Sequence, residues 1–247
     1  RRFDRGTQTI FSRQGEVNFR PSWSPDGRAI AWISNRGDQY DVQLKPADQS
    51  SQPALLLGRP SSLPIWEVSY ARSGPWVLYR VENRASDLYA IRPGVDSAPV
   101  ELVATEATER MPTLSPDGRW LAYVSDVTGR EEVYVKPFPN VTDATWQVST
   151  TGGSEPRWAR GGRELFFRDL QRDMVAVPIT PGPSFEWGEP EILFQGEDYL
   201  TASNGRMYDV APDGRFFMLR VLPDSTPPTV VVVQNFFEEL RQKAPHE

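Results

Sequence analysis

The chain has 247 residues, of which 38% are hydrophobic, and its 8 Trp, 8 Tyr and 12 Phe are enough to build a sizeable core. Its net charge of −6 is the wrong sign for a general nucleic-acid binder, because phosphate contacts require clustered Lys and Arg. The absence of cysteine excludes a disulfide framework and a thiolate metal site, and no apolar run approaches the roughly 20 residues that span a bilayer.

In chain order, Arg1–Ser12 contains a strand-like segment, Thr7–Phe11, and is followed by a pattern that the chain repeats. Pro21–Pro46 reads as a strand, a tight turn of sequence SPDG, and two more strands in which apolar and polar residues alternate. Met111–Pro139 has nearly the same pattern. Weaker copies start at Tyr70, Pro156 and Tyr208.

A turn glycine stands at the same place in every copy, at Gly27, Gly74, Gly118, Gly162 and Gly214. The interval of roughly 44 to 52 residues is typical of propeller blades, which have about four strands each. One blade cannot bury both faces of its sheet, so neighbouring blades must stack around an axis. The sequence therefore predicts an all-β fold, a β-propeller of four-stranded blades with five visible repeats, in one domain over residues 1–247. A β-sandwich with similar hairpins is the alternative.

The expected blades run almost end to end, over Phe19–Leu57, Trp66–Val103, Arg110–Val148 and Glu155–Phe194. The last repeat, Met207–Gln234, offers three strands, and its strand Thr229–Gln234 lacks an outer neighbour. Propellers commonly remove such an unpaired edge by letting the opposite terminus complete the blade. Thr7–Phe11 is the candidate for this fourth strand, which would close a five-bladed ring.

A short C-terminal helix is expected over Asn235–Lys243. Asn235 can cap its first turn, and Glu238 completes a capping-box pattern three residues later. Arg241 and Lys243 suit the negative end of the helix dipole. The apolar side of this helix is expected to pack on the propeller, with binding to a partner as the alternative.

Catalytic motifs are missing from the sequence. The single histidine, His246, is the penultimate residue, so a Ser-His-Asp arrangement within this chain is not expected, and no G-x-S-x-G motif is present. An all-oxygen calcium site or a glycosidase site would need converging carboxylates, and the sequence singles out no such pair. We predict no catalytic, cofactor-binding or metal-binding residue.

Three carboxylates recur immediately before turn glycines, in the pairs Asp26-Gly27, Asp117-Gly118 and Asp213-Gly214. Their recurrence favours a structural role, because a short Asp side chain can bind nearby backbone N–H groups and hold a turn. Four tryptophans fall at or beside equivalent inner-strand positions, where packing between blades explains them better than a ligand cage: Trp23, Trp66, Trp120 and Trp158.

Charged loops follow corresponding strands in four of the repeats and should gather on one face, at Asn35–Gln39, Glu82–Ser86, Asp126–Glu131 and Arg168–Asp173. Function often resides on loops that a rigid scaffold holds. Solvated loops have the same composition, so both interpretations stay open at this point. The residues of the candidate binding face are Arg36, Asp38, Arg84, Asp126, Arg130, Glu131, Arg168 and Arg172.

The segments PSWSPDGRAIAW and PTLSPDGRWLAYVSD resemble the repeats of the TolB-like propeller family, which is related to WD-repeat propellers. A closer resemblance involves RWLAYVSDVTGREEVYVKPFP, WQVSTTGGSEPRWARGGRELFF, YDVAPDGRFFML and VVVQNFFEEL. In order and spacing these segments are similar to the C-terminal propeller of many bacterial serine/threonine protein kinases. The likeness covers nearly the whole chain.

This resemblance implies a bacterial parent protein with a cytoplasmic kinase domain, often a membrane-spanning helix, and then a propeller on the extracytoplasmic side that acts as a sensor or docking module. Family propellers usually carry another blade upstream, so a truncated six-bladed propeller competes with the five-bladed ring. None of the kinase motifs lies in this chain. The expected partner is a protein or peptide, with no nucleic acid and no membrane insertion within this chain.

Two other functions fit the same repeat. One is the propeller domain of a prolyl-oligopeptidase-type serine peptidase, which requires a hydrolase domain downstream. The other is a stand-alone TolB-like periplasmic assembly protein, which would have its own N-terminal domain. The full reading frame separates all three possibilities.

Overall fold

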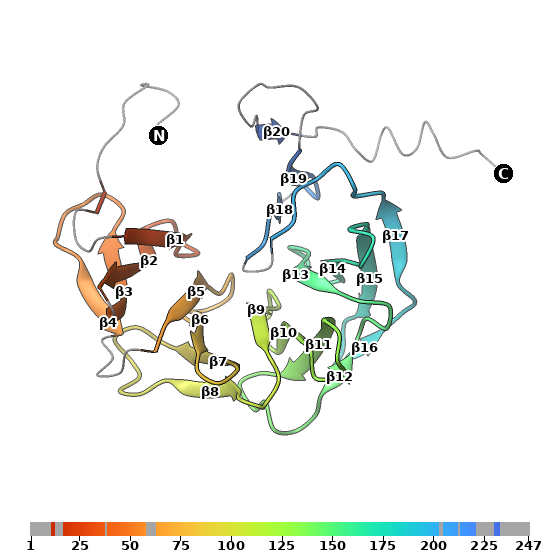
Figure 1. The fold of residues 1–247 in the computed structure, drawn as a ribbon, viewed down its shortest axis with the longest axis horizontal. Helices are drawn as coiled ribbons and strands as arrows, with labels where there is room; N and C mark the ends of the chain where they lie inside the picture. Colours follow the sequence, from red (N-terminus) through yellow and green to blue (C-terminus); the bar gives the residue numbers. More distant parts are fainter. Residues whose placement is uncertain are drawn as a thin grey trace. The chain divides into compact units, whose positions relative to one another are not determined.

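The computed structural model describes residues 11–12, 17–37, 39–57, 63–202, 205–211, 213–220 and 230–232. In these residues the regular structure consists of antiparallel strands (Figure 1), and no helix is long and apolar enough to cross a membrane. The chain forms two compact units that divide between Thr105 and Glu106. We describe them separately as unit 1 and unit 2.

Unit 1 contains two sheets whose strands pair in the order of the sequence (Figure 1). The first sheet consists of β1 (Val17–Trp23), β2 (Ala29–Arg36), β3 (Gln39–Pro46) and β4 (Ala54–Leu57). The second consists of β5 (Ile65–Tyr70), β6 (Val77–Glu82), β7 (Ser86–Ile91) and β8 (Val100–Val103). The two sheets share one apolar core, in which Ile33, Val42, Ile65 and Tyr79 are fully buried.

Unit 2 contains three sheets. The first consists of β9 (Glu109–Leu114), β10 (Trp120–Ser125), β11 (Glu132–Pro137) and β12 (Trp146–Gln147). The second consists of β13 (Ser154–Trp158), β14 (Glu164–Arg168), β15 (Met174–Thr180), β16 (Glu186–Trp187) and β17 (Glu191–Phe194). In the third, the described strands are β18 (Tyr208–Val210), β19 (Phe216–Leu219) and β20 (Val230–Val232).

The outer strand of the second sheet of unit 2 is interrupted. β16 pairs with the end of β15, and β17 pairs with residues 174–176 nearer its start. Between them the Gly188 N–H donates to the Pro178 carbonyl oxygen at 2.9 Å, so the segment continues to follow β15. Pro190 has no N–H to add to the ladder. β16 and β17 are therefore two pieces of one interrupted outer strand, which is why this sheet has five strands instead of four.

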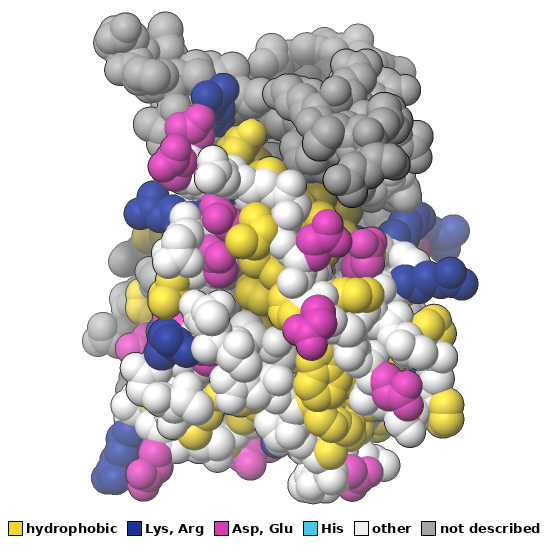
Figure 2. Space-filling model, turned by 90° about the vertical axis from the view of Figure 1, so that its right-hand side faces the viewer, with side chains coloured by type: hydrophobic (Ala, Val, Ile, Leu, Met, Phe, Trp, Pro, Cys, Tyr) yellow, Lys and Arg dark blue, Asp and Glu magenta, His cyan; other side chains and the backbone are white. Residues whose placement is uncertain are grey.

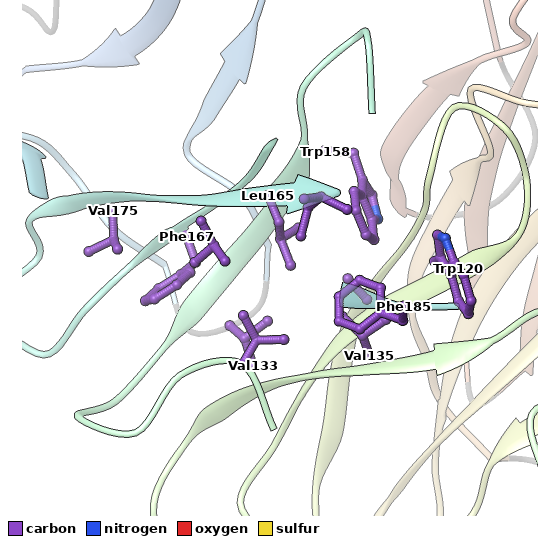
Figure 3. Packing of buried hydrophobic residues seen from close by; sticks show 12 residues of the cluster. Trp120, Val133, Val135, Trp158, Leu165, Phe167, Val175 and Phe185 are labelled. Carbon is purple, nitrogen blue, oxygen red and sulfur yellow. The ribbon is translucent and has the colours of Figure 1, made fainter. Parts of the chain in front are cut away.

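Aromatic and branched side chains fill the space between the first two sheets of unit 2 (Figure 3). Trp158 is 1% exposed and meets Phe185 edge-on, with ring centroids 6.4 Å apart. Trp120 lies 5.4 Å from the same phenylalanine. A second cluster joins β14 and β15 to β18 and β19 through Phe166 and Phe216, whose ring centroids are 5.0 Å apart. The middle sheet of this unit thus packs on one neighbour with each of its faces.

The three turns with an Asp-Gly pair, two of sequence SPDG and the last of sequence APDG, are held by their aspartates. Ser115 Oγ donates to Asp117 Oδ1 at 2.5 Å, and the Arg119 N–H donates to the same oxygen at 3.2 Å. Ser24, Asp26 and Arg28 repeat this arrangement at 2.6 and 3.0 Å. At the last turn the Arg215 N–H donates to Asp213 at 3.2 Å. The glycines that follow have φ angles of 69° at Gly27, 72° at Gly118 and 84° at Gly214.

Replacing Gly118 by valine should destabilise unit 2 by about 1–3 kcal/mol, because a β-branched residue is strained at positive φ. Thermal unfolding followed by circular dichroism measures this effect. Gly161→Val is the control, since Gly161 does not have a left-handed φ and nothing lies within 4 Å of an added Cβ. Equal melting temperatures for the two variants would contradict the turn assignment.

The prediction of an all-β fold built from four-stranded sheets is confirmed. Thr7–Phe11 lies outside the described residues except for Phe11, which belongs to no strand and whose carbonyl oxygen accepts a hydrogen bond from Lys45 Nζ at 2.9 Å. The helix over Asn235–Lys243 also lies outside them, as do Thr229, Val233 and Gln234 of the expected last strand, whereas Val230–Val232 forms β20. The number of blades, closure of the ring and a single domain over residues 1–247 stay predictions.

Candidate functional site

Three loops of unit 2 lie at the same end of its first two sheets. Residues 126–131 join β10 to β11, residues 169–173 join β14 to β15, and residues 148–153 lead from β12 to β13. Ser125 pairs with Glu109 and Ser154 with Arg168, which places these loops at the same ends of their sheets. We call these three loops the loop surface of unit 2.

A buried carboxylate fixes the loop that joins the first two sheets of unit 2. Glu132, fully buried at the start of β11, accepts hydrogen bonds from Ser149 Oγ and from the Gly152 N–H at 3.0 Å. It also accepts two from Arg130, at 2.8 and 2.5 Å, while the same guanidinium donates to the Thr150 carbonyl oxygen at 2.7 Å. Residues 149–152 are therefore fixed by charge-assisted hydrogen bonds.

The next blade repeats this device. Asp173, which directly precedes β15, accepts a hydrogen bond from the Gly196 N–H at 2.9 Å. Arg168, fully buried, donates from Nη2 to the Gly196 carbonyl oxygen at 2.9 Å and from Nε to the Arg172 carbonyl oxygen at 2.5 Å. The inclusion of Arg168 in an exposed binding face is thus wrong, because its guanidinium is used to fix backbone inside the blade.

Inner strands of unit 2 are joined by charged side chains as well. The Met207 N–H donates to Glu155 Oε2 at 2.6 Å, and Tyr208 Oη donates to the Glu155 carbonyl oxygen at 2.8 Å. Arg206 donates to the carbonyl oxygens of Met111, of Pro112 at 2.9 Å and of Pro156 at 2.7 Å. One guanidinium from the last sheet therefore binds the inner strands of the other two.

Glu155 is fully buried, and its burial raises the pKa of its carboxyl above the ordinary value of 4.5, against the opposite effects of the Met207 N–H and the Arg168 charge. A raised folded-state pKa means that the folded protein holds the proton more tightly than the unfolded chain. Its contribution to stability is therefore fully present below the unfolded-state pKa and is lost as pH rises through the folded-state pKa.

We accordingly expect the wild type to lose stability relative to Glu155→Gln as pH rises from about 4 to about 7. Urea unfolding of both proteins across this range measures the difference, in which the other titrating groups largely cancel. A difference that grows in favour of the wild type with rising pH would contradict the prediction.

Most of the predicted face residues in unit 2 are engaged within the protein. Asp126 Oδ1 accepts a hydrogen bond from the Thr108 N–H at 2.7 Å, and Glu131 pairs with Arg110 at 2.9 Å. Arg130 binds Glu132, as described above. Arg172 is exposed, with φ 68°. In unit 1, Arg36 at the end of β2 and Arg84 between β6 and β7 are exposed, and Asp38 lies outside the described residues.

Two apolar side chains on the loop surface are exposed. Val127 is 60% exposed and Leu170 is 57% exposed. Leu170 lies over Gly152, where an added Cβ would be 2.4 Å from Leu170 Cγ. Sequence reasoning missed this pair because it searched the loops for charge. It also missed the carboxylates at or near the start of the third strands, although four of the repeats carry one, at Asp41, Asp87, Glu132 and Asp173.

Within the described part of the chain, no three His, Cys, Asp or Glu side chains are grouped as metal ligands would be. A cleft of about 70 Å³ lies at the opposite, turn-bearing end of unit 2. Its lining includes Asp117, Arg119 and Trp120, and Asp117 and Arg119 are already paired at 2.8 Å. The loop surface is therefore the better candidate for recognition.

Neither a protein-family model nor a curated protein sequence matches the chain. Solved structures do match. TolB from Acinetobacter baumannii is 14% identical over 84% of this chain and 49% of its own length, with a TM-score of 0.62. A putative TolB from Agrobacterium tumefaciens is 20% identical over 86% of this chain and 78% of its own, with a TM-score of 0.63. The fold is a TolB-like β-propeller.

An oligogalacturonate lyase in complex with manganese has the same fold. It is 11% identical over 92% of this chain and 68% of its own length, with a TM-score of 0.65. Identities this low establish the fold alone. The chain spans about half the length of the Acinetobacter TolB, 49%. The predicted resemblance to TolB-like propellers is confirmed at the level of fold.

Proposed function

We propose that this propeller is a non-catalytic module that binds a protein or peptide ligand through the loop surface of unit 2. The observation that carries the proposal is the pair of exposed apolar side chains, Val127 and Leu170. Their loops are bound to buried charges, one by Arg130 to Glu132 and the other by the Arg172 carbonyl oxygen to Arg168. When a partner covers exposed apolar side chains, their burial favours binding by roughly 25 cal/mol per Å² of apolar surface.

The fixed loops favour binding for a second reason. Ordering a mobile loop on association costs conformational entropy, and a loop that is already held avoids most of that cost. Residues 149–152 are tied to Glu132, and Arg172 is tied through its carbonyl oxygen to Arg168. Arg172 adds a positive charge beside Leu170, which favours a ligand that carries an apolar side chain next to an acidic one.

We further propose that the chain is the C-terminal, extracytoplasmic part of a bacterial serine/threonine protein kinase, acting as its sensor or docking module. The ordered sequence segments quoted above support this proposal. Sequencing the gene upstream of Arg1 tests it: a reading frame without a kinase domain would refute the kinase parent and leave the binding proposal intact.

As a non-catalytic module, the purified chain should hydrolyse neither peptide nor glycoside reporters and should not phosphorylate an acceptor with ATP.

Selection of a random peptide library on the immobilised chain, followed by calorimetry with a selected peptide, tests the binding proposal. The double variant Val127→Asp/Leu170→Asp should weaken binding by roughly 30-fold or more, as expected for apolar anchors in an interface. Val95→Asp is the matched control, since Val95 is 64% exposed in the turn between β7 and β8 of unit 1. Equal affinities for the wild type and the double variant would overturn the assignment of this surface.

A further inference from the structure

The outer edge of the second sheet of unit 2 extends further along its sheet than the other outer edges that the structure describes, although it is broken at residues 188–190. β16 and β17 together follow β15 over residues 186–194, whereas β4 and β8 have 4 residues each and β12 has 2. Within the described residues, no strand pairs with the other side of this edge. Unpaired backbone groups of an edge strand are a template for another extended chain.

Apolar side chains accompany this edge. Trp187 is 37% exposed and stacks on Phe185 with ring centroids 5.3 Å apart, and Ile192 is 58% exposed. The side of the molecule that carries β16 and β17 faces the viewer in Figure 2, where hydrophobic side chains form a column down the middle. Leu193 and Phe194, partly buried, pack inward on the core that β14 and β15 share with β18 and β19.

The charge of this edge is one-sided. No Lys or Arg occurs between Asp173 and Gly205, whereas this segment contains Glu186, Glu189, Glu191, Glu197 and Asp198. Asp198 pairs with Arg220 at 2.6 Å, but within the described residues no cation pairs with the three glutamates of the edge. Figure 2 shows Asp and Glu beside the hydrophobic column and Lys and Arg toward the margins.

We propose that this edge is a second docking site, which adds one extended strand of a partner whose side chains alternate between basic and apolar. In such strand addition, main-chain hydrogen bonds supply affinity and alternate side chains supply specificity. The apolar side chains of the partner cover Trp187 and Ile192, and its basic ones meet the edge glutamates. The same glutamates repel the glutamates of a second copy of the edge. The site therefore disfavours pairing between two copies of this chain and favours a cationic strand.

The site goes beyond the function proposed above, because it uses a different surface and a partner of opposite charge. The test uses a fluorescently labelled peptide of alternating Lys and Val, with the alternating Glu and Val peptide as its counterpart. Binding to the full chain is followed by fluorescence anisotropy. A Lys and Val peptide with proline at alternate positions lacks the N–H groups that a new strand must donate, so it should not bind.

Two variants locate the binding. Ile192→Lys should weaken the Lys and Val peptide by about tenfold or more, and so should replacement of Glu186, Glu189 and Glu191 by glutamine. Leu55→Lys is the matched control, since Leu55 lies on the outer strand β4 of unit 1. Its side chain is 57% exposed, close to the 58% of Ile192. Its affinity should change by less than about twofold.

Any one of three outcomes would overturn the proposal. These outcomes are no binding of the Lys and Val peptide to the wild type, equal binding of the Glu and Val or proline-containing peptide, and equal losses in Ile192→Lys and Leu55→Lys. Circular dichroism melting of each variant checks that folding is retained, and the glutamine variant gives the same answer if Ile192→Lys does not fold. None of these outcomes bears on the loop surface, which is tested by its own variants.

Discussion

Replacing Gly196 by alanine is expected to destabilise unit 2 by about 4 kcal/mol, more than the roughly 1–3 kcal/mol that overpacking usually costs in a protein core. An added Cβ would lie 1.7 Å from the carbonyl oxygen of Arg172 and 2.7 Å from Arg168 Nη2. The first of these atoms belongs to the backbone and cannot rotate away. Relief requires movement of residues 169–173 or of Gly196 itself, and either movement breaks the hydrogen bonds from Gly196 to Asp173 or from Arg168 to Gly196.

Thermal unfolding should show this as a fall of roughly 10 °C in melting temperature, given about 2–4 °C per kcal/mol for a chain of this size. Gly161→Ala provides the control, because nothing lies within 4 Å of a Cβ at that position. Failure of Gly196→Ala to fold agrees with the prediction. A melting temperature equal to that of the control would mean that the two loops are not packed as described.

The second large effect is expected at Trp158. Truncation to alanine should cost about 3–5 kcal/mol, the usual range for a large aromatic side chain removed from a core. Trp158 is 1% exposed, meets Phe185 edge-on, and donates from Nε1 to the Thr113 carbonyl oxygen at 3.3 Å. Its loss therefore leaves a cavity between two blades and an acceptor without its donor.

Trp23 is the matched control for this variant. It stands at the same distance before its turn glycine as Trp158 does, but it is 59% exposed. Trp23→Ala should therefore change the free energy of unfolding by less than about 1 kcal/mol. Similar losses from both truncations, measured by urea unfolding, would show that burial between the blades is not what makes Trp158 important.

The blades were predictable because their determinants are local. A turn such as Ser115-Pro116-Asp117-Gly118 needs a hydrogen-bonding side chain and a residue that tolerates positive φ, and both requirements are visible in a few adjacent residues. Repetition of the pattern then predicts the sheets. The break at Gly188–Pro190 was not foreseen, although its proline was a local signal for it.

The candidate site was less predictable, because its determinants join residues that lie far apart in the sequence. Arg168 looks like a surface residue by type, and its buried partners include the Gly196 carbonyl oxygen, 28 positions away. Glu132 reaches Gly152 in the same way. The prediction that Trp23 packs between blades is wrong, since it is 59% exposed, whereas Trp120 and Trp158 do lie in the shared core.

The aromatic cluster of unit 2 also gives the molecule an optical property. The indole rings of Trp120 and Trp146 are 5.8 Å apart and inclined at 81°, and Phe185, from the next blade along the chain, lies against both. Electronic transitions of two indoles at this distance couple, which produces paired circular dichroism bands of opposite sign. The signal depends on the angle between the two indole rings. It therefore reports, without a label, whether Phe185 keeps its position against them.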